Sequence, residues 1–195
     1  MVEKITQTFS DCIETIINTA ENLTPLIDNA AKMIADVLAN DGKIMICGNG
    51  TGASDAQDFS SKLLNKYERE RPSLPAIALS TDTSTLTAIL HDGHHNEIFA
   101  KQIRALGVPD DVLLIISGKG KSFGLIQAVQ AAHAREMHVI VLGSSNEGDI
   151  EILLNPTDIE LYISSDVPAR IQEVQRLVLH CLCDLIDTHL FGFLK

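Results

Sequence analysis

Five short apolar segments, rich in valine and isoleucine, follow one another through the middle of the chain; they span residues 43–47, 76–79, 112–117, 138–143 and 159–163. They do not alternate polar with apolar residues, which is typical of strands buried on both faces of a parallel sheet. Crossover helices fit the intervening segments, which span residues 53–66, 83–90, 96–106 and 122–134. We therefore expect an α/β fold, a doubly wound five-stranded parallel sheet with the flavodoxin-like strand order 2-1-3-4-5.

Helices are predicted on both sides of this sheet core. Residues 3–20 carry apolar side chains at helical spacing, and a second helix follows Thr24 and Pro25. The two apolar stripes consist of Ile5, Phe9, Ile13, Ile16 and Ile17, and of Leu26, Ala30, Ile34, Val37 and Leu38. A long helix is expected from Pro168 to about Phe193. We thus expect one domain over residues 1–195, with an N-terminal helical pair in 1–40, the sheet core in 43–165 and the C-terminal helix in 168–194.

Composition excludes several classes of protein. The chain has 195 residues, of which 45% are hydrophobic and 21% charged, and these values fit one globular domain. Its 26 acidic residues outnumber its 15 basic ones, so the formal net charge is −11 and direct binding to nucleic acid is disfavoured. The longest apolar runs, 112–116 and 139–142, are far too short for a membrane helix, so no membrane partner is expected.

The four cysteines, Cys12, Cys47, Cys181 and Cys183, show no CxxC spacing. No apolar leader with a cleavage site opens the chain. Buried free thiols are therefore favoured over a metal or redox site, and a reducing, cytoplasmic location is expected.

Two glycine-containing loops follow the first and third predicted strands. They read Gly-Asn-Gly-Thr-Gly over 48–52 and Ser-Gly-Lys-Gly-Lys-Ser over 117–122. Either loop alone is compatible with ordinary turn chemistry. In a sheet of order 2-1-3-4-5, however, the two loops flank the switch point where ligands bind, and their backbone amides can face an anion. We predict a phosphate site there, reinforced by Lys119 and Lys121; no Walker or dinucleotide motif is present.

Six segments, in order along the chain, carry a family resemblance. They are Cys-Gly-Asn-Gly at 47–50, Asp-Ala-Gln at 55–57, Arg-Pro-Ser-Leu-Pro-Ala-Ile-Ala at 71–78, Ala-Leu-Gly at 105–107, Asp-Val-Leu-Leu at 111–114 and Arg-Ile-Gln-Glu at 170–173. Over nearly its full length the chain resembles the sugar isomerase (SIS) domain proteins of the phosphoheptose isomerase family. Segments 70–75 and 181–187 are most similar to the DnaA initiator-associating branch of that family.

The resemblance implies a homotetramer held together by the terminal helices, with a sugar-phosphate site shared between subunits. Family isomerases convert sedoheptulose 7-phosphate to D-glycero-D-manno-heptose 7-phosphate, a reaction that needs a base at carbon and an acid at oxygen. Asn49, Asp92, Gln172 and His180 match site positions of the family. Together with the two loops, they define the candidate sugar-phosphate site: Asn49, Gly50, Thr51, Asp92, Ser117, Gly118, Lys119, Ser122, Gln172 and His180.

Two positions depart from the catalytic pattern that the family implies. Asp58 stands where the family has a histidine, and Lys62 stands where it has the catalytic glutamate. Because lysine is protonated at neutral pH, Lys62 is a poor base, and an ammonium in place of a carboxylate disfavours the zinc site of some family members. Gly52 also replaces a phosphate-loop serine, and Ala169 replaces an aspartate. We therefore expect no metal and no cofactor.

These departures lead to a main functional hypothesis and two alternatives. The main hypothesis is a catalytically degraded, tetrameric sugar-phosphate-binding protein that associates with the initiator DnaA and regulates replication initiation, its acidic surface favouring a basic protein partner. One alternative is an active phosphoheptose isomerase with His180 as its catalytic residue, and the other is a sugar-phosphate sensor. The C-terminal Leu190, Phe191 and Phe193 are candidates either for contact with a partner protein or for packing against a sister subunit.

Overall fold

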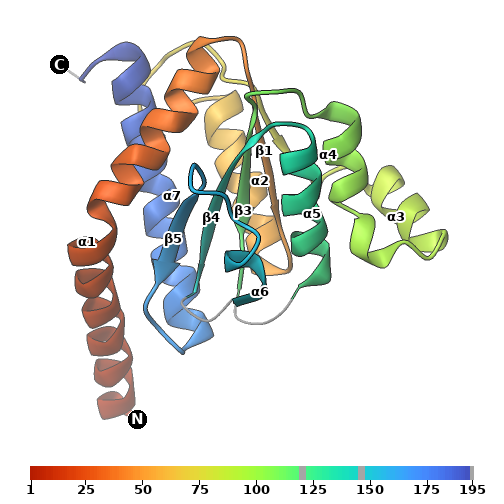
Figure 1. Ribbon diagram of the computed structural model, residues 1–195. Helices are drawn as coiled ribbons and strands as arrows, with labels where there is room; N and C mark the ends of the chain where they lie inside the picture. Colours follow the sequence, from red (N-terminus) through yellow and green to blue (C-terminus); the bar gives the residue numbers. More distant parts are fainter. Residues whose placement is uncertain (119–121, 145–147, 194–195) are drawn as a thin grey trace.

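The five apolar segments form a parallel sheet between two layers of helices (Figure 1), and the computed structural model describes residues 1–118, 122–144 and 148–193. The strand order β2-β1-β3-β4-β5 confirms the predicted fold class and order. The elements are α1 (Val2–Ala39), β1 (Ile44–Gly48), α2 (Thr51–Leu64), β2 (Ala76–Ala78), α3 (Thr83–His91), η1 (His95–Glu97), α4 (Ala100–Leu106), β3 (Val112–Ile116), α5 (Phe123–Ala134), β4 (His138–Ser144), α6 (Gly148–Glu151), β5 (Ile159–Ile163) and α7 (Pro168–Phe191).

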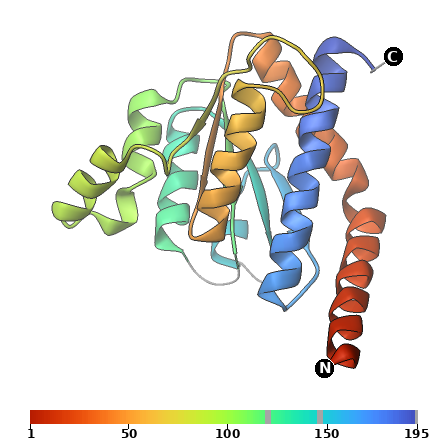
Figure 2. The ribbon, with the colours of Figure 1, turned by 180° about the vertical axis from the view of Figure 1, so that it is seen from behind.

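Both faces of the sheet are buried, which explains why the strand sequences lack polar alternation. Successive side chains of a strand point to opposite faces, so Ile44 and Ile46 pack with α1, α2 and α7, whereas Met45 and Cys47 pack with α4 and α5. Helices α2 and α7 lie side by side on the first face (Figure 2). They begin near the carboxyl ends of the strands, where the two glycine loops are expected to form a site.

The predicted N-terminal helical pair is wrong, because α1 is a single helix that continues through Pro25. Proline removes one backbone donor and crowds the preceding turn, which led us to expect a break. Packing along α7 outweighs this local cost, since Leu23 and Ile27 are buried on either side of the proline. The same register leaves Leu26, which was predicted to face inward, 38% exposed.

The N-terminal half of α1 presents an apolar stripe that this chain does not cover. Ile5, Phe9, Ile13 and Ile17 recur every four residues, and each is between 51% and 66% exposed. Figure 1 shows this end of α1 extending past the sheet. Arg170 of α7 holds this half of α1 through a hydrogen bond, which its Nη1 donates to the main-chain carbonyl of Thr8 at 3.2 Å. The stripe is therefore a surface that an additional chain could bury.

All four cysteines are free, but they are not all buried as predicted. Cys47 and Cys183 are buried, and burial raises the pKa of the Cys183 thiol to about 12. Cys12 is partly buried, whereas Cys181 is exposed because it lies two positions from Cys183 and faces the other side of α7. Within the described ranges, no helix is long and apolar enough to cross a membrane.

Candidate functional site

The first glycine loop makes a tight turn between β1 and α2. Gly50 has a φ of +56°, in the left-handed region that favours glycine. A Cβ atom on either Gly48 or Gly52 would lie 2.5 Å from the carbonyl oxygen of Ile116, at the end of β3. Glycine at these two positions therefore lets the first loop pack directly against the strand that leads into the second loop.

A side-chain hydrogen bond joins the two loops. Asn49 Nδ2 donates to Ser122 Oγ at 2.9 Å, although the residues are 73 positions apart in sequence. Ser122 also caps α5, because its Oγ accepts a hydrogen bond from the amide of Leu125. The N-termini of α2 and α5 thus lie at the same edge of the sheet, where the positive ends of the two helix dipoles favour an anion. Lys119 and Lys121, which were predicted to reinforce this site, lie outside the described residues.

The start of the second loop is held in place by Gln175, a residue that sequence reasoning missed. Gln175 Nε2 donates to the carbonyl of Ser117 at 2.6 Å and to the carbonyl of Leu142 at 3.2 Å. Gln175 and Ser117 are both buried. One sequence feature could have identified Gln175: it is a polar residue at helical spacing between Ile171 and Val178, within the apolar stripe of α7.

Facing stripes of α2 and α7 extend the site away from the loops. Gln172 and His180 are eight residues apart on α7, and both are half-buried. The His180 ring stacks against Tyr67, just beyond the end of α2, at a centroid distance of 5.9 Å. On α2, Lys62 Nζ forms an ion pair with Asp58 Oδ2 at 2.5 Å. Along α2 and α7, amide, imidazole and charged side chains thus continue the candidate site beyond the two loops.

Comparison with known proteins places this arrangement in a family. The SIS domain profile matches residues 8–144. The phosphoheptose isomerase of Chromohalobacter salexigens is 54% identical over 184 residues, which is 94% of this chain and 93% of the relative. The chain belongs to the phosphoheptose isomerase family of SIS domain proteins.

Further relatives agree in sequence and in structure. The phosphoheptose isomerase of Alkalilimnicola ehrlichii is 51% identical over 97% of this chain and 97% of the relative. The structure of a phosphoheptose isomerase from Francisella tularensis is similar with a TM-score of 0.90 and 44% identity, covering 96% of this chain and 98% of that one. That from Neisseria gonorrhoeae has a TM-score of 0.89 and 41% identity, covering 95% and 98%. The family assignment made from sequence is thus confirmed, whereas the DnaA-associating branch finds no support in these comparisons.

The resemblance implies a zinc site in some family members, and the residues that this chain has at those positions do not fit the metal. These positions are Asp58, Lys62, Gln172 and His180. Zinc takes thiolate, imidazole and carboxylate ligands, and Lys62 instead places an ammonium beside the only carboxylate of the set. Among the described residues, no group of three or more histidine, cysteine, aspartate or glutamate side chains is arranged to hold a metal ion.

Asp92, predicted for the sugar-phosphate site, and the C-terminal residues predicted as partner contacts lie in separate parts of the fold. Asp92 caps the C-terminal end of α3 and is exposed; no hydrogen bond or ion pair of its side chain occurs within the described part of the chain. At the C-terminus, Leu190 and Phe191 pack against the core, and the Arg69 guanidinium lies 5.6 Å from the Phe191 ring centroid. Phe193 alone of the three predicted contact residues is largely exposed, at 85%.

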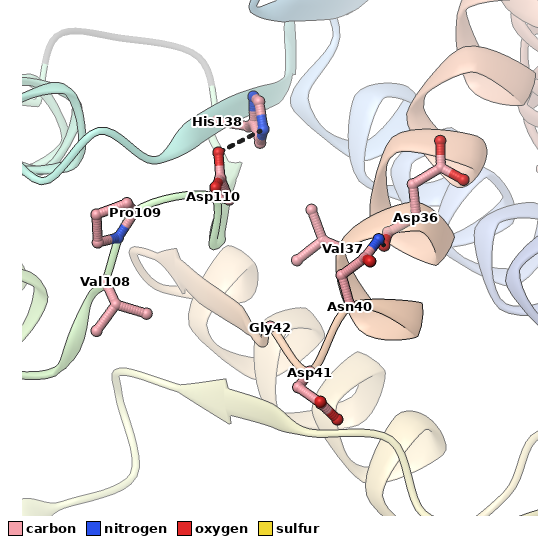
Figure 3. Close-up of a pocket in the computed structure, with 9 residues that line it drawn as sticks. All are labelled: Asp36, Val37, Asn40, Asp41, Gly42, Val108, Pro109, Asp110 and His138. Carbon is pink, nitrogen blue, oxygen red and sulfur yellow. Dashed lines mark hydrogen bonds and ion pairs between the residues drawn. The ribbon is translucent and has the colours of Figure 1, made fainter.

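A separate cavity of about 480 Å³ opens at the amino-terminal ends of the strands, opposite the glycine loops (Figure 3). Carboxylates of Asp36, Asp41 and Asp110 line it together with His138. Asp110 and His138 point toward one another there, with 4.0 Å between Oδ1 and Nε2. Because it lies at the opposite edge of the sheet from the two glycine loops, this cavity is not part of the candidate sugar-phosphate site.

Proposed function

We propose that this chain binds a sugar phosphate at the carboxyl ends of β1 and β3. The observation that carries this proposal is the Asn49–Ser122 hydrogen bond, which joins two glycine loops at the switch point of the sheet. In this proposal the phosphate binds to loop amides and the N-termini of α2 and α5, while Gln172 and His180 contact the sugar. The names of the relatives support a heptose phosphate, such as sedoheptulose 7-phosphate, as the ligand.

Sedoheptulose 7-phosphate is expected to raise the melting temperature of the protein, because a ligand that binds only the folded state stabilises it. Asn49→Ala removes the bond between the loops and should weaken binding about tenfold, in line with the loss of about 1.4 kcal/mol. Thermal-shift titration measures both effects. Asn22→Ala, which removes an exposed asparagine of α1, is the matched control and should leave the shift unchanged. Equal shifts in all three proteins would contradict the assignment of Asn49 to the site.

Two candidate functions follow from ligand binding. The first is isomerisation of the heptose phosphate, which the names of relatives at 54% and 51% identity support. In this candidate His180 acts as the base at carbon, since Lys62 is the ion-pair partner of Asp58. The second is binding without isomerisation, by a regulator that associates with DnaA. The Asp58–Lys62 pair favours this second candidate, because it stands at the positions where the family pattern has its histidine and catalytic glutamate.

An isomerase assay with sedoheptulose 7-phosphate separates the two candidates. For the isomerase we expect turnover, and His180→Ala should lower kcat/KM at least about a hundredfold, the usual contribution of a general base. Ligand binding without turnover would instead favour the regulator. That candidate then requires capture of purified DnaA at micromolar concentration, with weaker capture by Phe193→Ala than by Ile152→Ala, a variant of a similarly exposed residue elsewhere.

We also propose that the chain forms a homotetramer in the cytoplasm, with the exposed stripe of α1 at a subunit interface. Size-exclusion chromatography with light scattering should give the mass of four chains. Phe9→Asp places a charge in the stripe and should shift the protein to smaller species. The control, Glu14→Asp, changes a residue of the same helix outside the stripe and should leave the mass unchanged. A wild-type protein that is monomeric at all concentrations would refute the tetramer.

A further inference from the structure

Arg176, in the third turn of α7, is held by Asp55 of α2 through two of its nitrogen atoms. Its Nη2 and Nε groups both donate to the same oxygen, Asp55 Oδ1, at 2.5 Å and 3.2 Å. The remaining group, Nη1, has no hydrogen-bond partner among the residues that the structure describes. The guanidinium is therefore oriented by the protein on one side and retains free N–H donors on the other.

The burial of the two side chains differs sharply. The Asp55 side chain is 1% exposed, whereas that of Arg176 is 50% exposed. Arg71 is a contrasting case, an arginine whose role is structural. Its side chain is 1% exposed, and all three of its nitrogen atoms donate hydrogen bonds, to Asp187 and to backbone carbonyls. The Arg176 side chain is thus fixed by an ion pair, while half of it remains accessible to a ligand.

Arg176 lies within the candidate site. Gln172, Arg176 and His180 are four residues apart, so they share one face of α7 at intervals of about 6 Å along its axis. Asp55 in turn lies one helical turn beyond Thr51, at the first glycine loop. The Arg176–Asp55 pair therefore lies one turn away from the proposed phosphate position, between the two residues proposed to contact the sugar.

We propose that Arg176 binds a second negatively charged group of the ligand, so that the preferred ligand class is a sugar phosphate carrying a further phosphate or a carboxylate. This inference rests on the proposed sugar-phosphate function, and it predicts that a ligand with two anionic groups binds more tightly than a monophosphate such as sedoheptulose 7-phosphate. A guanidinium that is already oriented loses little conformational entropy when it binds a planar carboxylate or a phosphate.

Isothermal titration calorimetry with two matched ligands tests the inference. Fructose 1,6-bisphosphate and fructose 6-phosphate differ only in the second phosphate, and we expect the bisphosphate to bind at least about tenfold more tightly, the effect of one charge-assisted hydrogen bond. A third ligand, 6-phosphogluconate, asks whether a carboxylate can replace the second phosphate. Tighter binding of fructose 1,6-bisphosphate or 6-phosphogluconate than of fructose 6-phosphate supports the proposal, and the tighter binder of the two identifies the preferred second group.

The variants remove Arg176 without leaving a buried charge unpaired. Asp55→Asn combined with Arg176→Gln should abolish the preference for a second anionic group. Arg176→Lys keeps the charge opposite Asp55 and should reduce the preference, which provides a second test if the double variant does not fold. Arg104→Gln is the control, because Arg104 also pairs with a carboxylate, Glu97, and its side chain is 47% exposed, but it lies on α4.

The outcomes distinguish this inference from the function on which it rests. If none of the three ligands binds and sedoheptulose 7-phosphate does not bind either, both proposals are refuted. If monophosphates bind without a preference for a second anionic group, or if the preference survives in both Arg176 variants, the inference about Arg176 is refuted and sugar-phosphate binding stands.

Discussion

Gly48→Ala is expected to destabilise the protein by about 3 kcal/mol and to abolish sugar-phosphate binding. The added Cβ atom would lie 2.5 Å from the carbonyl oxygen of Ile116 and 2.7–2.8 Å from backbone atoms of Gly52. These are backbone atoms of the sheet and of the first loop, so they cannot move aside as a flexible side chain would. The expected loss of unfolding free energy therefore lies at the upper end of the range for overpacked cores. The loop would shift away from β3, and the bond between Asn49 and Ser122 would break.

Urea unfolding measures the stability, and titration with sedoheptulose 7-phosphate measures the binding. Gly118→Ala is the matched control for stability, since a Cβ atom at Gly118 meets no atom of the described residues within 4 Å. Its stability should stay within about 0.5 kcal/mol of the wild type, as for other unstrained surface changes. A Gly48→Ala protein with wild-type stability and affinity would show that close contact between β3 and the first loop is not required.

Arg71→Met is expected to cost about 3–5 kcal/mol of unfolding free energy, the range for breaking a buried ion pair by removing one partner. The Arg71 and Asp187 side chains are 1% and 4% exposed, and Nε lies 2.8 Å from Asp187 Oδ1. The other arginine nitrogens donate to the carbonyls of Leu63 and Lys62, at 2.6 Å and 2.7 Å. The variant leaves a buried carboxylate without a counter-charge and the end of α2 without these donors.

Chemical unfolding of both the variant and a control tests this prediction. Lys32→Met removes the same kind of charge from an exposed pair with Asp36 and should change stability by less than about 1 kcal/mol. A further variant, Asp187→Asn together with Arg71→Met, removes both charges and should recover part of the loss. If Arg71→Met and Lys32→Met cost the same, the Arg71–Asp187 pair does not stabilise the fold as described.

This ion pair also bears on the resemblance to the DnaA-associating branch. The two segments that carry that resemblance, 70–75 and 181–187, meet through Arg71 and Asp187 in the core of the same chain. Their matching residues thus have a structural role that any member with this packing would need. The structural role alone can account for the similarity of these segments. Partner binding must therefore be tested directly, for example by capture of DnaA.

The strands could be predicted from sequence because they follow from local composition, and their order was expected from the common arrangement of doubly wound sheets. Segments such as Val112–Ile116 are buried on both faces and therefore carry no polar residue at all, and crossover helices between them imply a parallel sheet. The two glycine loops were likewise recognisable, because a turn with the φ of Gly50 and the close approach at Gly48 favour the residue without a side chain. The family assignment depended on these same segments.

Contacts between side chains of distant helices could not be predicted from local sequence patterns. Pro25 predicts a helix break, and α1 continues because α7, more than 140 residues later, packs along it. Asp55 and Arg176 are 121 residues apart, and only the contact of α2 with α7 turns them into a pair. The sequence by itself thus determined which segments become strands, loops and helices, since this depends on neighbouring residues. Tertiary structure alone decided which charged and polar side chains of different helices meet, since this depends on how the helices pack on the sheet.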